Sequence, residues 1–213
     1  YATQSRRQPG STAKPIFDYG PGMEYNDFST YTLFNDEPWT YTNGPEIGNW
    51  DGSYQGLITL RQALSVSRNI PALKAFQQVD KKNIVTFVNN LGLDVAYSTK
   101  SENYKKDEKT GADNVINEAY SIGGMAYGVT PLDMAEAYAS FANGGYHIET
   151  HAVTKIEYRS TGETVDFSEE KKKVMSDSTA YLMNNVLKYA VDYGFNGGAK
   201  VAGSTVAAKT GTS

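Results

Sequence analysis

The chain contains no cysteine among its 213 residues, so a disulfide framework and a thiolate metal site are both excluded. No apolar run approaches the roughly 18 residues that a transmembrane helix needs, and the amino terminus is not signal-like. Neither sign of charge is in large excess, because 20 Lys and Arg oppose 24 Asp and Glu and the net charge is −4. This balance argues against a general nucleic-acid surface or an anionic membrane surface.

Helix signals dominate what is present. Capping residues and apolar periodicity predict helices at about 11–19, 60–66, 72–79, 81–91, 131–142 and 177–193. Strand signals are few: a hairpin over 153–167 and a strand over 205–212. For the helix at 131–142 the predicted buried stripe is Leu132, Ala135, Tyr138, Ala139 and Ala142. These elements predict an α/β or α+β fold in a single domain.

The first helix carries a hydroxyl and an amine on one face. Ser11 is a favoured N-cap residue, and Lys14 follows it by three positions. Pro15 then falls in the first turn, where it removes no helical hydrogen bond. We expect the helix to end where Gly20-Pro21-Gly22 follows Tyr19. Taken alone, Ser-x-x-Lys is a weak indication of a nucleophile and its base.

A long segment over residues 25–56 shows neither helical nor strand periodicity and is rich in aromatic residues. Structureless connections of that length inside a compact domain are unusual and tend to be functional. Its aromatic side chains either line a groove or hold the segment against the core.

Three short motifs stand in order along the chain: Ser11-Thr12-Ala13-Lys14, Ser67-Arg68-Asn69 and Lys209-Thr210-Gly211-Thr212. Each is weak alone. Together, in this order and at these separations, they resemble the signature Ser-x-x-Lys, Ser-Asp-Asn and Lys-Thr-Gly of serine β-lactamases and penicillin-binding proteins, with Arg68 in place of Asp. The chemistry is consistent, because a serine hydroxyl needs a base, and a lysine serves as one only when burial or a nearby cation lowers its pKa.

The sequence around the motifs resembles the transpeptidase domain of class A penicillin-binding proteins, and looks closest to the 1a types of Gram-positive bacteria. The stretches that carry the resemblance are Arg7 to Pro15, Asn49-Trp50-Asp51, Ile58 to Ala72, Gly123-Gly124, Gly128 to Ala135 and Phe141 to Gly145. The resemblance covers essentially the whole chain. It implies a β-lactamase-like α/β fold, with a helical region and a central antiparallel sheet that is incomplete in this chain. We therefore expect residues 1–213 to be a transpeptidase domain truncated at both ends, with strands before residue 1 and after residue 213.

The site residues have distinct expected roles. Lys14 is the base for Ser11, and Lys209 is the cation that depresses the pKa of Lys14. The Ser67 hydroxyl relays the proton to the leaving amine, and the Asn69 amide orients the substrate and the Lys14 amine.

The last motif is expected to hold the carboxylate end of the substrate. Thr210 and Thr212 present hydroxyls to it, and Gly211 lets the chain approach closely. By resemblance, the backbone N–H groups of Ser11 and Thr212 form the oxyanion hole.

The resemblance implies a D,D-transpeptidase that cross-links peptidoglycan through a Ser11 acyl-enzyme formed on D-Ala-D-Ala. Its partners are peptidoglycan stem peptides and β-lactams, with no cofactor, no metal and no nucleic acid. A membrane anchor and a glycosyltransferase domain are expected in the parent protein, at the extracytoplasmic face of the membrane. A D,D-carboxypeptidase and a non-catalytic penicillin-recognising sensor are the alternatives.

Two rival enzymes are disfavoured by the sequence. A class A β-lactamase needs a Glu-x-x-Leu-Asn stretch, which the region around Lys105 to Thr110 lacks, and it has Asp where this chain has Arg68. A metal enzyme would have to use His147 and His151, which do not form His-Glu-x-x-His. On a strand these two residues lie about 13 Å apart.

Overall fold

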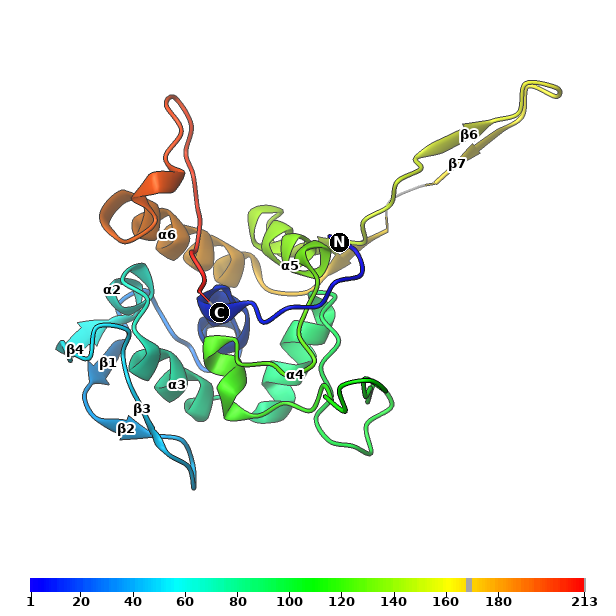
Figure 1. Ribbon diagram of the computed structural model, residues 1–213. Helices are drawn as coiled ribbons and strands as arrows, with labels where there is room; N and C mark the ends of the chain where they lie inside the picture. Colours follow the sequence, from blue (N-terminus) through cyan, green and yellow to red (C-terminus); the bar gives the residue numbers. More distant parts are fainter. Residues whose placement is uncertain (168–169, 213) are drawn as a thin grey trace.

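The computed structural model describes residues 1–167 and 170–212 (Figure 1). The α-helices are α1 (Gly20–Tyr25), α2 (Leu60–Ser65), α3 (Asn69–Gln78), α4 (Lys81–Asn90), α5 (Pro131–Ala142) and α6 (Asp177–Tyr193). Short 3₁₀ segments are η1 (Gly10–Ala13), η3 (Glu118–Ile122) and η4 (Gly197–Ala199), and η2 (Pro15–Tyr19) is a π-helix. In the described part of the chain, no helix is both long and apolar enough to cross a bilayer.

The strands form antiparallel pairs. The pairs are β1 (Leu33–Asp36) with β4 (Gly56–Thr59), β2 (Trp39–Thr40) with β3 (Glu46–Ile47), β5 (Tyr146–Ile148) with β8 (Lys171–Lys173), and β6 (Lys155–Glu157) with β7 (Thr164–Asp166). The predicted hairpin is thereby confirmed, and it projects away from the helices (Figure 1). Helices combined with antiparallel strands agree with the predicted fold class.

Two other strand predictions were wrong. The segment 25–56 was expected to be structureless, but it contains β1, β2 and β3. Strand β1 pairs with β4 about 20 residues further along the chain, whereas β2 and β3 are two-residue strands, too short to show an alternating pattern. The predicted strand over 205–212 has no strand partner among the described residues. Instead, the Thr210 N–H donates to Asn196 Oδ1 at 2.9 Å, so a side chain holds this segment in place.

The first helical region differs from its prediction at both ends. Ser11 does not cap the helix, because no side-chain cap bond occurs at its start. The helical path also continues past Tyr19 through α1 to Tyr25. Gly20 serves packing rather than termination, since a Cβ there would lie 2.9 Å from the Phe87 ring.

The capping predictions for three helices are confirmed. Thr59 with Gln62, and Thr130 with Asp133, form capping boxes at α2 and α5. The Ser176 side chain accepts from a backbone N–H at the start of α6. Helix α3, expected over about residues 72–79, begins at Asn69 instead. The reason is a cap from a distant residue: Asn49 Oδ1 accepts from the Asn69 N–H at 2.9 Å.

The stripe predicted for α5 was wrong. The buried residues of the helix are Ala137, Ser140 and Phe141, whereas Ala135, Ala139 and Ala142 are exposed. The helix turns this face inward because it packs against α6, where Asn184 Nδ2 donates to the Phe141 carbonyl at 2.7 Å. Tyr138 remains partly buried beside the core.

One apolar core supports the first motif. Its buried members include Ala13, Ile16, Phe17, Phe76, Phe87, Met183 and Val186. These residues come from η1, η2, α3, α4 and α6, so the helical region that bears Ser11 and Lys14 is surrounded by packed elements. Burial of this kind fixes side-chain positions to within tight limits, because protein interiors are close-packed.

Candidate active site

A cleft of about 420 Å³ brings the three motifs together. Its lining residues are Ser11, Trp50, Ser67, Asn69, Phe195, Thr210, Gly211 and Thr212. They come from η1, the loop after β3, the turn between α2 and α3 with the first residue of α3, the residues that follow α6, and the carboxyl-terminal segment. The carboxyl-terminal segment runs back from α6 to the amino-terminal helical region (Figure 1).

Glycines allow the first and last motifs to touch. Gly10 has φ +55°, and a Cβ there would collide with the Thr212 carbonyl. A Cβ at Gly211 would lie 2.7 Å from the Pro9 carbonyl oxygen and 2.9 Å from the Thr12 methyl. The close approach expected of Gly211 is therefore made to the first motif, along the rim of the cleft.

Lys14 lies beneath the second motif with no exposed surface. Its Nζ donates to the Ser67 carbonyl at 2.7 Å and to Asn69 Oδ1 at 2.8 Å, and lies 3.3 Å from Ser67 Oγ. Ser67 has φ +56°, a left-handed conformation that is uncommon for a residue other than glycine. This conformation turns both the carbonyl and the hydroxyl of Ser67 toward the same amine.

Lys209 reaches the same hydroxyl from the other end of the chain. Its Nζ lies 2.8 Å from Ser67 Oγ and 2.9 Å from the Thr210 carbonyl oxygen. Ser67 Oγ is therefore shared by two amines, those of Lys14 and Lys209.

Both amines lie in surroundings that disfavour their charge. Burial lowers the pKa of Lys14 to about 7, and the Lys209 ammonium lowers it in the same direction. Burial likewise lowers the pKa of Lys209 to about 8. Near neutral pH, Lys14 thus spends a substantial fraction of its time as a neutral amine, which is the form that can accept a proton.

Ser11 lies half-buried on η1, one helical turn before Lys14. Within the described residues its hydroxyl makes no hydrogen bond, so it is not committed to a structural contact. The backbone beside it is held firmly: the Tyr138 hydroxyl donates to the Thr12 carbonyl at 2.9 Å. A hydroxyl with this freedom, on a fixed backbone at the cleft, is suited to attack a bound carbonyl carbon.

Asp18 lies four residues after Lys14 and is fully buried. Neither carboxyl oxygen has a hydrogen-bond partner among the described residues. Burial raises the pKa of Asp18 well above its usual value, and the Lys14 charge opposes that rise. Asp18 was not predicted from the sequence, where only its place one turn after Lys14 among apolar neighbours sets it apart.

Two aromatic side chains form one side of the cleft. Trp50 and Phe195 meet edge to face with ring centroids 5.1 Å apart, and Trp50 remains 62% exposed. Trp50 belongs to the aromatic segment whose role was left open, whereas Phe195 was missed. Other aromatics of the segment, such as Phe28 and Phe34, are buried in the core. Both interpretations of the segment therefore apply to different residues.

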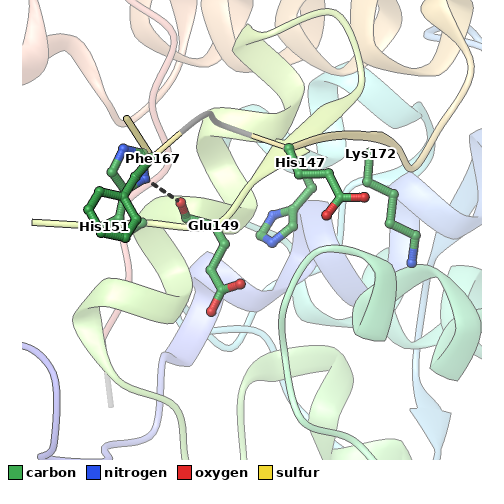
Figure 2. Close-up of a pocket in the computed structure, with 7 residues that line it drawn as sticks. His147, Glu149, His151, Phe167 and Lys172 are labelled. Atoms are coloured by element: carbon green, nitrogen blue, oxygen red, sulfur yellow. Dashed lines mark hydrogen bonds between the residues drawn. The ribbon is translucent and has the colours of Figure 1, made fainter. Parts of the chain in front are cut away.

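The two histidines lie at a separate pocket, which Figure 2 shows with His147 and His151 on either side of Glu149. His151 Nδ1 is 3.3 Å from the Glu149 carbonyl oxygen. The His147 ring instead approaches Gly92, where a Cβ would lie 2.9 Å from it. Over residues 1–167 and 170–212, no three His, Cys, Asp or Glu side chains are grouped to hold a metal ion.

Comparison with known proteins shows the family of the chain. The sequence model described as penicillin binding protein transpeptidase domain matches residues 1–213. Penicillin-binding protein 1A/1B of Bacillus subtilis is 48% identical over the whole chain, which spans 22% of that protein. Penicillin-binding protein 1A of Streptococcus pneumoniae is 38% identical, and the chain spans 28% of it.

Solved structures share the fold. The D,D-transpeptidase domain of a peptidoglycan glycosyltransferase from Eggerthella lenta aligns with a TM-score of 0.79 at 21% identity, over 99% of this chain and 54% of that one. An imipenem acyl-enzyme complex of penicillin-binding protein A from M. tuberculosis aligns with a TM-score of 0.81 at 19% identity, over 99% and 49%. The chain belongs to the transpeptidase-domain family of penicillin-binding proteins and is similar to its class A, 1A-type members.

Proposed function

We propose that the chain is the catalytic part of a D,D-transpeptidase that cross-links peptidoglycan stem peptides through an acyl-enzyme on Ser11. The observation that carries the proposal is the sharing of Ser67 Oγ by Lys14 and Lys209, at 3.3 and 2.8 Å, beside an uncommitted serine hydroxyl. This arrangement supplies a nucleophile, a base and a proton route within one cleft.

Acylation begins when neutral Lys14 takes the Ser11 proton and the serine oxygen attacks the penultimate D-Ala carbonyl. Negative charge develops on the carbonyl oxygen, where the backbone N–H groups of Ser11 and Thr212 stabilise it. The peptide bond then breaks and the terminal D-Ala leaves as an amine. The proton that this amine needs passes from Lys14 through Ser67 Oγ, so no net proton is lost from the site.

The third motif recognises the substrate. Lys209 supplies positive charge, and Thr210 and Thr212 supply hydroxyls, for the terminal carboxylate of D-Ala-D-Ala. Asn69 donates through Nδ2 to the Gly48 carbonyl at 2.8 Å and accepts from Lys14, which fixes its amide plane at the cleft. Trp50 and Phe195 give the cleft an apolar side for the rest of the stem peptide.

The second half of the reaction transfers the acyl group. An amine from a neighbouring stem peptide attacks the Ser11 ester and gives one proton to Lys14. Lys14 passes this proton to the Ser11 oxygen as the ester bond breaks. A β-lactam resembles D-Ala-D-Ala and acylates Ser11 in the same manner. The protein acts at the extracytoplasmic face of the membrane, where peptidoglycan lies, beside a membrane anchor and a glycosyltransferase domain in the parent protein.

The test is a reaction of the complete protein with a stem pentapeptide ending in D-Ala-D-Ala and an acceptor amine. We expect release of D-Ala together with a cross-linked product, and loss of both in Ser11→Ala. Release of D-Ala with only the hydrolysed tetrapeptide would identify a D,D-carboxypeptidase. Binding without D-Ala release would identify a sensor.

A further inference from the structure

A buried ionic network lies directly behind the second motif. Arg68, the middle residue of that motif, points away from the cleft and is fully buried. Its Nε donates to Asp36 Oδ2 at 2.7 Å, and one terminal nitrogen donates to Asp51 Oδ2 at 2.9 Å. The other terminal nitrogen donates to the Ser53 carbonyl. Asp36 is also fully buried, so each charge depends on the other for compensation.

Asp36 connects this network to the start of α3. Its second oxygen accepts from Asn49 Nδ2 at 2.7 Å. The Asn49 oxygen in turn accepts from the Asn69 N–H at 2.9 Å, which caps α3 at the residue that holds Lys14. A continuous chain of hydrogen bonds therefore runs from Asp36 through Asn49 to Asn69.

Arg68 restrains the residue before it as well. Ser67 occupies the left-handed region, which costs a serine energy that its surroundings must supply. On one side the Ser67 N–H donates to the Leu64 carbonyl at 3.1 Å. On the other, the Arg68 side chain is held at three points by Asp36, Asp51 and Ser53. The backbone at Ser67 is thus fixed from both directions.

We propose that Asp36 and Arg68 are positioning residues that hold Ser67 and Asn69 in the geometry needed for proton transfer with Lys14. Neither side chain lines the cleft. The proposal rests on the proposed function. It predicts an effect on the rate of acylation rather than on the affinity of the first, non-covalent complex.

The planar fork of arginine suits this role. Arginine donates in several fixed directions, whereas a lysine at the same place offers a single flexible amine. An apolar side chain would fill the space without defining the orientation of Ser67. A loss of position at this site would therefore occur even where the fold is retained.

The test uses the complete protein and a fluorescent penicillin. For each variant we would measure the acylation rate constant at saturation, the dissociation constant of the first complex and the melting temperature. Arg68→Met alone leaves the Asp36 charge buried without its partner, so it lowers the melting temperature. Asp36→Asn combined with Arg68→Met removes both charges and restores the melting temperature toward that of the wild type. We expect the double variant still to acylate about 10- to 100-fold more slowly, at an unchanged dissociation constant.

Recovery of the acylation rate together with the melting temperature would overturn the proposal. Arg68→Lys provides a second test that keeps the charge. It is expected to slow acylation in the same direction, and a wild-type rate in this variant would also overturn the proposal.

A neighbouring, more exposed ion pair provides a control. Lys74 Nζ lies 2.7 Å from Glu37 Oε1, between α3 and the end of β1, without contact to the motifs. Glu37→Gln combined with Lys74→Met should acylate at the wild-type rate, and an equal loss there would contradict a specific role for Arg68. Absence of acylation in the wild type would instead be a failure of the proposed function.

Discussion

Lys209 Nζ lies 2.8 Å from Ser67 Oγ, although 142 residues separate the two along the chain. Lys14 Nζ lies 3.3 Å from the same oxygen. Proton transfer in the proposed reaction depends on this shared hydroxyl. The predictions below follow from the charges and contacts around it.

Removal of the base should abolish most of the reaction. Lys14→Met is expected to slow acylation by a penicillin about 10²- to 10⁴-fold, because the serine hydroxyl loses its proton acceptor. The measurement is the rate of labelling with a fluorescent penicillin, beside a melting curve that reports folding. A folded variant that acylates at the wild-type rate would contradict the role of Lys14.

The pH profile of the acylation rate should be bell-shaped. Lys14 has a pKa of about 7 and acts when neutral, so the rate rises as the pH passes about 7. Lys209 has a pKa of about 8 and acts when charged, so the rate falls above about 8. Rates of β-lactam acylation from pH 5 to 10 check this, with apparent values that belong to the coupled pair.

Substitutions at Lys209 should move the two limbs differently. Lys209→Gln removes a neighbouring cation, so the pKa of Lys14 rises and the acid limb moves to higher pH. Lys209→Arg retains its charge throughout the range, so the alkaline limb should disappear. An acid limb that stays in place in Lys209→Gln would show that the two amines are not coupled.

The contact between the first and last motifs should depend on Gly10. Gly10→Ala imposes both a left-handed alanine and a collision with the Thr212 carbonyl. The matched control is Gly162→Ala, where φ is +72° but no atom lies near. The control should cost only about 1–2 kcal/mol. Gly10→Ala should lower both the melting temperature and the acylation rate by more, and equal effects would contradict the close packing.

Nitrocefin should label the protein without turnover. The sequence lacks the Glu-x-x-Leu-Asn stretch that supplies the deacylating water in class A β-lactamases. We therefore expect a burst of ring-opened nitrocefin that stays bound to Ser11 as the acyl-enzyme and equals the amount of protein, followed by little further product. A sustained linear rate at high turnover would identify a β-lactamase instead.

The parts of the fold that the sequence predicted well are those governed by neighbouring residues. Thr59 with Gln62, and Thr130 with Asp133, act within one helical turn, so their pattern alone places a helix start. The start of α3 was misplaced because its cap, Asn49, lies 20 residues away. The inward face of α5 was misplaced because packing against α6 decided it.

The residues of the candidate site likewise divide into those that a local sequence pattern marks and those that only the fold brings to the site. The three motifs contain six of the eight residues that line the cleft, since their spacing and order are specific. Asp18, Asp36 and Phe195 were missed because no short pattern marks them. Asp18 and Asp36 stand out because the fold buries them, and Phe195 because the fold places its ring against Trp50 at the cleft.

The segment 205–212 adds one structural proposal. It runs beside the first motif without a strand partner among the described residues. We propose that strands outside this chain pair with it to complete the sheet. In the complete protein, the amides of this segment should exchange hydrogen slowly, and rapid exchange there would contradict the pairing.

Mass spectrometry after incubation of the complete protein with a penicillin tests the central claim most directly. We predict a mass increase equal to one intact drug molecule, located on the peptide that contains Ser11 and absent in Ser11→Ala. Folded protein that stays unmodified, or that carries the drug on another residue, would contradict the assignment of Ser11 as the nucleophile.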